Sequence, residues 1–77
     1  MHAVDIGVQA DDRQGLLRDI SAALTAEKVN VIGVKSATDS GVADMRFTLE
    51  VRDLNQTQRV LAEIKKVSGV HRAWRLT

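Results

Sequence analysis

Residues 43–52, ADMRFTLEVR, alternate apolar and polar side chains without a break. A period of two places every second side chain on the same side of a β-strand, so this stretch predicts a strand with one dry and one wet face. The side chains predicted to enter a core are Ala43, Met45, Phe47, Leu49 and Val51. Because polar residues alternate with them, the opposite face of the sheet can meet water.

The segment after this strand predicts an amphipathic helix. Asp53 or Asn55 can cap its start, because each is followed three residues later by a glutamine that can complete a capping box. Apolar side chains then recur at spacings of three and four residues, which places them on one side of the helix. The predicted buried stripe consists of Val60, Leu61, Ile64 and Val67. Ser68-Gly69 supplies the turn that ends the helix.

Residues 70–77 predict a closing strand with an irregularity. Arg72 falls on the same side as the apolar residues Val70 and Trp74, so strict alternation would bury a charge among apolar side chains. A β-bulge near Arg72 or Ala73 would resolve this conflict. We therefore expect this last strand to be bulged.

The residues before the strand at 43–52 predict a strand, a helix and a second strand. Residues 3–10 alternate with a period of two, and residues 15–28 change to helical spacing. The predicted helix stripe consists of Leu16, Leu17, Ile20, Ala23, Leu24 and Glu27. Residues 29–38, VNVIGVKSAT, return to β-branched side chains, and Ser40-Gly41 turns the chain into the strand that follows.

The order strand, helix, strand, strand, helix, strand predicts an α+β fold of the ferredoxin-like βαββαβ type. Right-handed crossovers give a four-stranded antiparallel sheet with both helices on one face. The strands at 3–10 and 43–52 are expected in the centre of the sheet, with the other two at its edges. A length of 77 residues leaves little room for a second core, so residues 1–77 are interpreted as a single domain.

Composition excludes several classes of protein. The chain has no cysteine, which excludes disulfides and thiolate metal sites, and its formal net charge of +1 lacks the basic excess of a committed nucleic-acid binder. No apolar run approaches the roughly 20 residues that span a bilayer, and no signal segment opens the chain. We therefore expect a cytoplasmic domain without membrane contact.

No catalytic, metal or cofactor site is predicted. His2 and His71 lie at opposite ends of the chain, and neither has a carboxylate or second ligand at metal-binding spacing in the sequence. Ser21 has no neighbouring histidine to activate it. The five glycines form neither a dinucleotide fingerprint nor a phosphate loop.

RNA binding is also disfavoured, although RNA-recognition modules share the predicted topology. Those modules stack bases on aromatic rings of the two central strands, and the exposed positions of these strands carry no aromatic residue here. Trp74 is expected to pack across the sheet or against a partner. The basic pairs Lys65-Lys66 and Arg72-Arg75 are typical of solvated surfaces.

Residues 11–20, DDRQGLLRDI, form an unusually charged entrance to an apolar helix. If Asp12 caps this helix, its first turn directs free backbone N–H groups and a partial positive charge outward, which suits a carboxylate. Gly15 weakens a helix but lets a ligand or another backbone approach closely. The alternative is that Asp11 and Asp12 only cap, Arg13 is solvated and Gly15 relieves crowding.

The stretch DDRQGLLRDISAALTAEKVNVIGV resembles the first half of an ACT domain, and the resemblance covers the whole chain. The segments GLLRDIS, KVNV, MRFTLEVRDL and VLAEIKKVSGV resemble the C-terminal ACT domain of the long RelA/SpoT-type enzymes that make and hydrolyse (p)ppGpp. This resemblance implies a regulatory fragment of an enzyme whose hydrolase and synthetase domains lie N-terminal to it. The fragment itself is expected to be no enzyme and to use no cofactor.

The resemblance also implies an effector site between the first loop of one copy and the second strand of another. The predicted effector-binding residues are Asp12, Arg13, Gln14, Gly15, Leu16, Leu17, Asn30, Val31 and Ile32. The N–H groups near Gly15 to Leu17 would bind the carboxylate of an amino acid, and Asp12 or Asn30 its ammonium group. Apolar neighbours favour a small branched aliphatic side chain over a charged one.

The partners implied by the resemblance are a second copy in a homodimer or higher homo-oligomer and the catalytic domains of the parent chain. Ribosome contact is implied for the ribosome-associated members, but the sequence has no evident basic or aromatic RNA surface. Two alternatives stay open. One is an ACT domain of another amino-acid-controlled enzyme, such as a hydroxyacid dehydrogenase of serine synthesis, and the other is a structural or ribosome-contacting adaptor.

Overall fold

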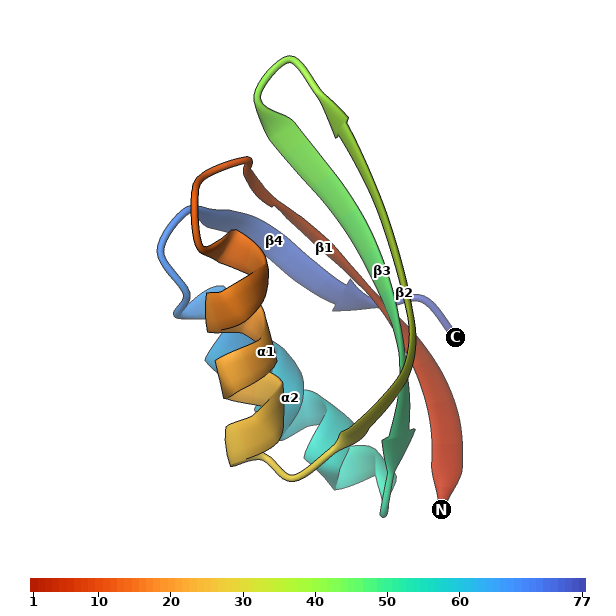
Figure 1. The fold of residues 1–77 in the computed structure, drawn as a ribbon. Helices are drawn as coiled ribbons and strands as arrows, with labels where there is room; N and C mark the ends of the chain where they lie inside the picture. The colour runs from red at the N-terminus through yellow and green to blue at the C-terminus, as the bar shows by residue number, and fades with distance from the viewer.

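Six elements follow one another in the predicted order (Figure 1). The computed structural model describes residues 1–77. The elements are β1 (His2–Asp11), α1 (Leu16–Ala26), β2 (Asn30–Asp39), β3 (Val42–Val51), α2 (Leu54–Lys65) and β4 (Val70–Arg75). The sheet has the order β2-β3-β1-β4 with antiparallel neighbours, and both helices cover one of its faces. The ferredoxin-like fold and its central strands are thus confirmed.

The core lies between the helices and the dry face of β3 and β1. All five apolar residues of the alternating stretch at 43–52 are buried, as predicted. β1 pairs with β3 without a register shift, from His2 opposite Val51 to Asp11 opposite Val42. The alternation of β1 is therefore in phase with that of β3, and Val4, Ile6, Val8 and Ala10 complete the sheet side of the core.

The start of α1 differs from the prediction that Asp12 caps it. The N-cap residue is Gly15, which has a left-handed backbone with φ of 81°, and no side chain caps this end. The backbone N–H of Asp12 instead donates to the carbonyl of Gly41 at 2.9 Å, so the chain stays tied to the β2–β3 hairpin beyond the end of β1. The helix consequently begins at Leu16.

The buried stripe of α1 is narrower than predicted. Leu16, Ile20 and Leu24 are buried at spacings of four residues, while Leu17 is 51% exposed. Leu17 lies about 100° around the helix from Leu16, on the flank that faces β2 and not the core. Its exposure leaves an apolar side chain available beside the loop.

The predicted cap of α2 is confirmed at Asp53, whose carboxylate accepts a hydrogen bond from the Gln56 backbone N–H at 2.9 Å. Gln56 is completely buried, and its side-chain oxygen accepts from the Arg52 backbone N–H while its amide group donates to the carbonyl of Glu27. A buried polar group with these partners is satisfied, and it ties α2 to the end of α1. Val67 lies beyond the end of α2 and packs half-buried against the core.

The predicted irregularity in the last strand is a bulge at His71, one residue before the expected position. Gln9 pairs with Arg72 and Ala10 with Val70, so His71 has no partner of its own on β1. Ala73 then enters the core, and Arg72 and Trp74 share the face away from the helices. Neither helix is long and apolar enough to cross a membrane.

Candidate functional site

Arg13 fixes the loop between β1 and α1. Its Nε donates to the Ser68 carbonyl at 2.8 Å, one terminal nitrogen donates to the Gln14 carbonyl at 3.1 Å, and the other reaches the Asp19 carboxylate at 2.8 Å. One half-buried guanidinium thus connects the loop with the α2–β4 turn and with α1. Neither the predicted ligand role nor the solvated alternative for Arg13 included this clamp.

Asp19 is the acidic partner that completes the clamp. Hydrogen bonds from Arg13 and then from Arg18 hold the pKa of its carboxyl below the usual range. The carboxylate therefore stays ionised well into the acid range, which keeps the loop attached to the first turn of α1. The loop is therefore held in place by contacts within the chain.

The first turn of α1 presents backbone donors without acceptors. Leu16 donates to the Arg13 carbonyl at 3.2 Å and Asp19 to the Gly15 carbonyl at 3.0 Å, but the N–H groups of Leu17 and Arg18 have no acceptor within the chain. Such free donors are expected at a helix start, where they give a partial positive charge. Carboxylate binding at this turn stays a prediction.

The space above Gly15 is occupied by a side chain that the sequence analysis did not include. A Cβ atom added to Gly15 would lie 2.7 Å from a terminal nitrogen of Arg18, so the guanidinium covers the gap that was expected to be open. The Arg18 side chain is 80% exposed, and its only ion pair is with Asp19 at 3.3 Å. The sequence did contain a signal for this contact, because Arg18 lies three residues after Gly15, about one helical turn further along the chain.

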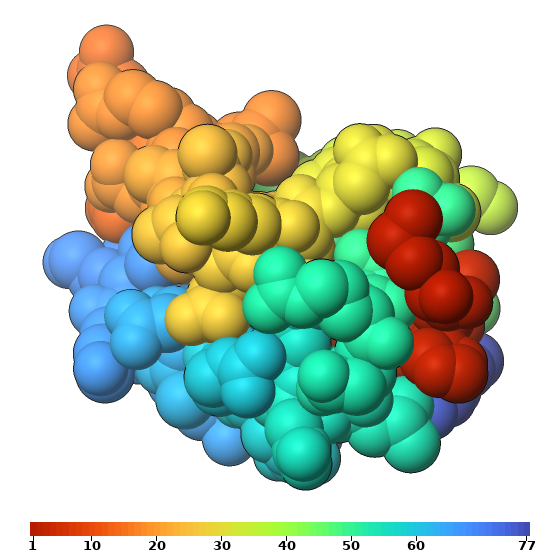
Figure 2. All heavy atoms as spheres, turned by 90° about the horizontal axis from the view of Figure 1, so that it is seen from below, coloured from red at the N-terminus to blue at the C-terminus, as the bar shows by residue number.

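A cavity of about 290 Å³ lies beside this loop on the helix side of the sheet. Its lining combines the loop and first helical turn with β2 and β3, and consists of Asp12, Arg13, Gly15, Leu16, Leu17, Arg18, Val34, Ser36, Ala43 and Met45. Figure 2 shows the surface notched between the start of α1, in orange, and β2, in yellow. The sequence analysis did not include Val34 and Ser36 among the site residues, although they pair with the buried Phe47 and Met45 of β3.

The other predicted site residues lie at the far end of α1 within one chain. Asn30, Val31 and Ile32 begin β2, and the 11 residues of α1 place them roughly 16 Å from Gly15 at about 1.5 Å per residue. The Asn30 side-chain amide donates to Glu50 at 2.9 Å. The register with β3 shifts between Val31 and Gly33, which leaves Ile32 in a bulge. A site formed by the loop of one copy and the start of β2 of another copy stays a prediction.

His71 has a carboxylate neighbour that the sequence analysis did not expect. Its Nε2 lies 2.7 Å from an oxygen of Asp11, because the bulge in β4 brings the two residues together across the sheet edge. No group of three histidine, cysteine, aspartate or glutamate side chains is placed to hold a metal ion.

Comparison with known proteins finds a family model for the ACT domain that matches residues 1–75. The chain is 42% identical over 77 residues to the GTP pyrophosphokinase of Escherichia coli K12, and 42% identical over 76 residues to the bifunctional (p)ppGpp synthase/hydrolase RelA of Mycobacterium tuberculosis. These alignments cover 97% and 96% of this chain but 10% of each relative. The chain thus spans about a tenth of the length of the curated relatives it matches.

Solved structures agree on the fold. The ACT domain from the GTP pyrophosphokinase of Chlorobium tepidum superposes with a TM-score of 0.85 at 18% identity, and the match covers 96% of both chains. The small subunit of acetolactate synthase from Thermotoga maritima also gives a TM-score of 0.85, at 9% identity over 100% of this chain and 48% of that one. At such identities the likeness concerns the fold alone.

Proposed function

The chain belongs to the ACT-domain family and is homologous to a small part of the RelA/SpoT-type GTP pyrophosphokinases, and from this premise we propose that it is their amino-acid-sensing and oligomerisation domain. Its proposed partners are a second copy of itself and the catalytic domains of a cytoplasmic parent enzyme. Those domains would make or hydrolyse (p)ppGpp, and this domain would only regulate them.

The observation that carries the sensing proposal is the loop cavity with its unpaired donors. The N–H groups of Leu17 and Arg18 and the Arg18 guanidinium offer charge-assisted hydrogen bonds to one carboxylate. The carboxylate of Asp12 lies in the same lining and can accept from an ammonium group. A zwitterionic α-amino acid carries both groups, so its main-chain atoms match the polar part of the cavity.

The apolar part of the lining selects the side chain of the effector. Leu17, Val34 and Met45 contribute hydrocarbon surface, and Ser36 is the polar residue beside them. Burying a charged side chain there would lack a partner of opposite sign, which costs free energy. The volume of about 290 Å³ lies at the small end of ligand pockets and suits a small apolar amino acid.

Oligomerisation is supported by the apolar edge of the sheet. β2 has no neighbouring strand on its outer side, and its side chains Val31, Ile32 and Val34 are 37%, 53% and 46% exposed. An unpaired strand with exposed apolar groups is a template for pairing with another strand. Antiparallel pairing of β2 with its copy would carry Asn30 of one chain toward the loop of the other.

Calorimetry with the common amino acids, combined with light scattering, tests both parts of the proposal. Valine or isoleucine is expected to release heat and to shift the chain toward the dimer, because a ligand that binds the assembled state better favours it. Arg18→Gln is expected to weaken binding about fivefold, and Arg59→Gln, on the outer side of α2, is the matched control. An oligomer that binds none of the amino acids would refute sensing, and a chain that stays monomeric would refute assembly.

A further inference from the structure

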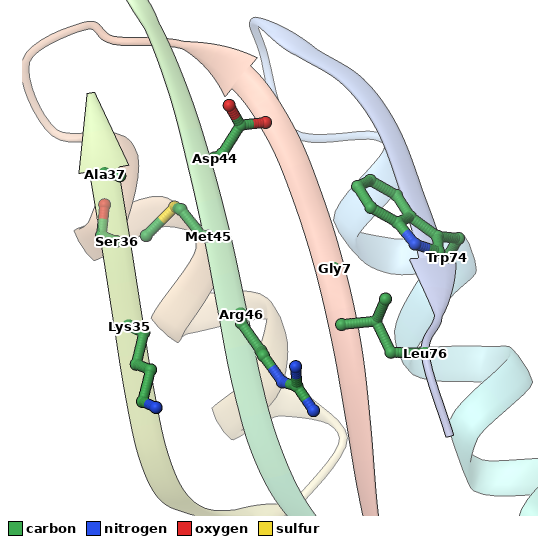
Figure 3. A pocket seen from close by; sticks show the side chains of 9 residues that line it. All are labelled: Gly7, Lys35, Ser36, Ala37, Asp44, Met45, Arg46, Trp74 and Leu76. Atoms are coloured by element: carbon green, nitrogen blue, oxygen red, sulfur yellow. The ribbon is translucent and has the colours of Figure 1, made fainter. Parts of the chain in front are cut away.

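The sheet face away from the helices carries a second cavity, of about 270 Å³. Its lining comes from all four strands and from the residue after β4, and consists of Gly7, Lys35, Ser36, Ala37, Asp44, Met45, Arg46, Trp74 and Leu76. Figure 3 shows Trp74 and Leu76 on one side, Lys35 on the other, and Gly7 between them. The loop cavity lies on the helix side, and the two cavities share Ser36 and Met45 in their linings.

Gly7 creates this cavity by letting the indole ring lie on the sheet. Gly7 pairs with Trp74 across the β1–β4 ladder, and a Cβ atom at Gly7 would lie only 2.5 Å from Cζ2 of the ring. The backbone of Gly7 does not have positive φ, so the close approach of the ring is what requires glycine here. A glycine inside a strand otherwise weakens it. Arg72 holds the ring from the neighbouring position, with its guanidinium carbon 4.4 Å from the ring centroid.

The charges in the lining leave one cation without a partner. Arg46 forms an ion pair with Asp5, and the Asp44 carboxylate accepts a hydrogen bond from the Gln9 amide at 3.2 Å. Lys35 forms no ion pair. An apolar wall of indole and leucine therefore stands opposite an ammonium group that forms no ion pair, although it is near enough to Asp5 to help Arg46 lower the pKa of that carboxyl.

We propose that this cavity binds a single-ring aromatic monocarboxylate, with its ring against Trp74 and Leu76 and its carboxylate toward Lys35. Because Gly7 lies against the indole and Arg72 stacks over it, the ligand ring would pack against the indole edge, and edge-to-face aromatic pairs gain free energy beyond the burial of their area. One unpaired cation matches one negative charge, and the Asp44 carboxylate in the lining opposes multiply charged phosphates. The three residues that would contact this ligand, Lys35, Trp74 and Leu76, do not line the proposed amino-acid site.

Trp74 itself reports binding, because the chain has one tryptophan and no tyrosine. The emission of Trp74 is followed during titration with benzoate, with acetate as an anion without a ring and with benzyl alcohol as a ring without a charge. Benzoate is expected to give a saturable change in the millimolar range, with at least threefold weaker binding for the other two compounds. Equal affinities for benzoate and acetate would overturn the proposed role of the ring. Equal affinities for benzoate and benzyl alcohol would overturn the proposed role of the charge.

Two pairs of variants locate the site. Lys35→Gln is expected to weaken benzoate about two- to fivefold and to leave benzyl alcohol unchanged, whereas Lys65→Gln on α2 changes neither. Gly7→Ala is expected to abolish binding by displacing the indole, while Gly33→Ala, whose added Cβ has only ordinary contact with Thr48, preserves it.

The outcomes that would overturn the proposal are defined for each pair. If Gly7→Ala unfolds, as judged by circular dichroism, the lysine pair alone decides. Equal benzoate affinities for Lys35→Gln and Lys65→Gln would refute the assigned site. Tighter binding of guanosine monophosphate than of benzoate would show that the cavity prefers a nucleotide to an aromatic carboxylate, and it would refute the proposed ligand class.

Discussion

Lys28 adopts a left-handed backbone, with φ of 59°, immediately after α1. Its N–H donates to the Thr25 carbonyl and that of Val29 to the Leu24 carbonyl, the pattern of a Schellman helix end, which glycine usually occupies. Lys28→Gly relieves about 1–2 kcal/mol of strain and loses part of this to unfolded-state entropy, so we expect a net stabilisation of about 0.5–1 kcal/mol. Urea unfolding measures it, and a destabilised Lys28→Gly would contradict the assignment of strain. Ala26→Gly, in the last turn of the same helix, is the control and should cost about 1 kcal/mol.

Arg13 and Arg18 lie close together, but only Arg13 is expected to stabilise the fold. Arg13 makes three hydrogen bonds from a half-buried position, whereas Arg18 is exposed. Lysine keeps the charge but cannot reproduce the planar set of donors. We expect Arg13→Lys to cost about 1–2 kcal/mol and Arg18→Lys less than about 0.5 kcal/mol, as measured by thermal unfolding. Similar losses for the two variants would argue against the clamp.

At the scale of elements, two carboxylates connect segments that must stay together. Asp19 ties α1 to the loop, and Asp5 ties β1 to β3, where hydrogen bonds from Arg46 and then Thr48 lower its pKa. A carboxyl whose folded pKa is lowered stabilises the fold above its unfolded pKa of about 4, and this contribution is lost as the pH falls further through the folded value.

Stability is therefore expected to decline below about pH 4 as these two contacts are protonated. The measurement is the urea midpoint between pH 5 and pH 2. Asp19→Asn and Asp5→Asn should each lower the midpoint at pH 5 and flatten its dependence on pH. Asp39→Asn, at the exposed end of β2, is the control. An unchanged slope in both variants would show that other groups cause the acid loss.

How well the elements could be predicted depended on whether their determinants were local. The alternation of β3 and the Asp53 cap are local, so both were predicted from the residues themselves. The prediction that Asp12 caps α1 was wrong because the backbone N–H of Asp12 donates to the carbonyl of Gly41, and no local sequence pattern indicates this long-range contact. The cover of Gly15 by Arg18 and the contribution of Val34 to the loop cavity likewise depend on tertiary packing.

At the scale of the whole molecule, the two cavities and the free edge of β2 are arranged around one sheet. The loop cavity ends at β2, and so does the apolar edge proposed for pairing. Because one strand serves both, assembly and effector binding are expected to be thermodynamically coupled, typically by 1–3 kcal/mol. In the proposed parent enzyme, the same coupling would transmit the bound state to the catalytic domains.

A charge on the edge of β2 tests this coupling. Ile32→Lys places an ammonium group near the start of the unpaired edge of β2, where pairing with a second copy would desolvate it. The variant should remain folded, because Ile32 is exposed and lies outside the core, but its dimer should dissociate at least tenfold more readily in sedimentation equilibrium. Effector affinity in calorimetry should fall with it, by about five- to 150-fold, if the second copy completes the site.

Leu54→Lys is the matched control, since Leu54 is equally apolar and 50% exposed at the start of α2, away from β2. Dimerisation of Ile32→Lys at the level of Leu54→Lys would assign assembly to another surface. A monomeric Ile32→Lys with undiminished effector affinity would instead show that the loop cavity of a single chain suffices for binding. In that case the start of β2 would be an assembly element alone, and the effector would have to act through the loop held by Arg13.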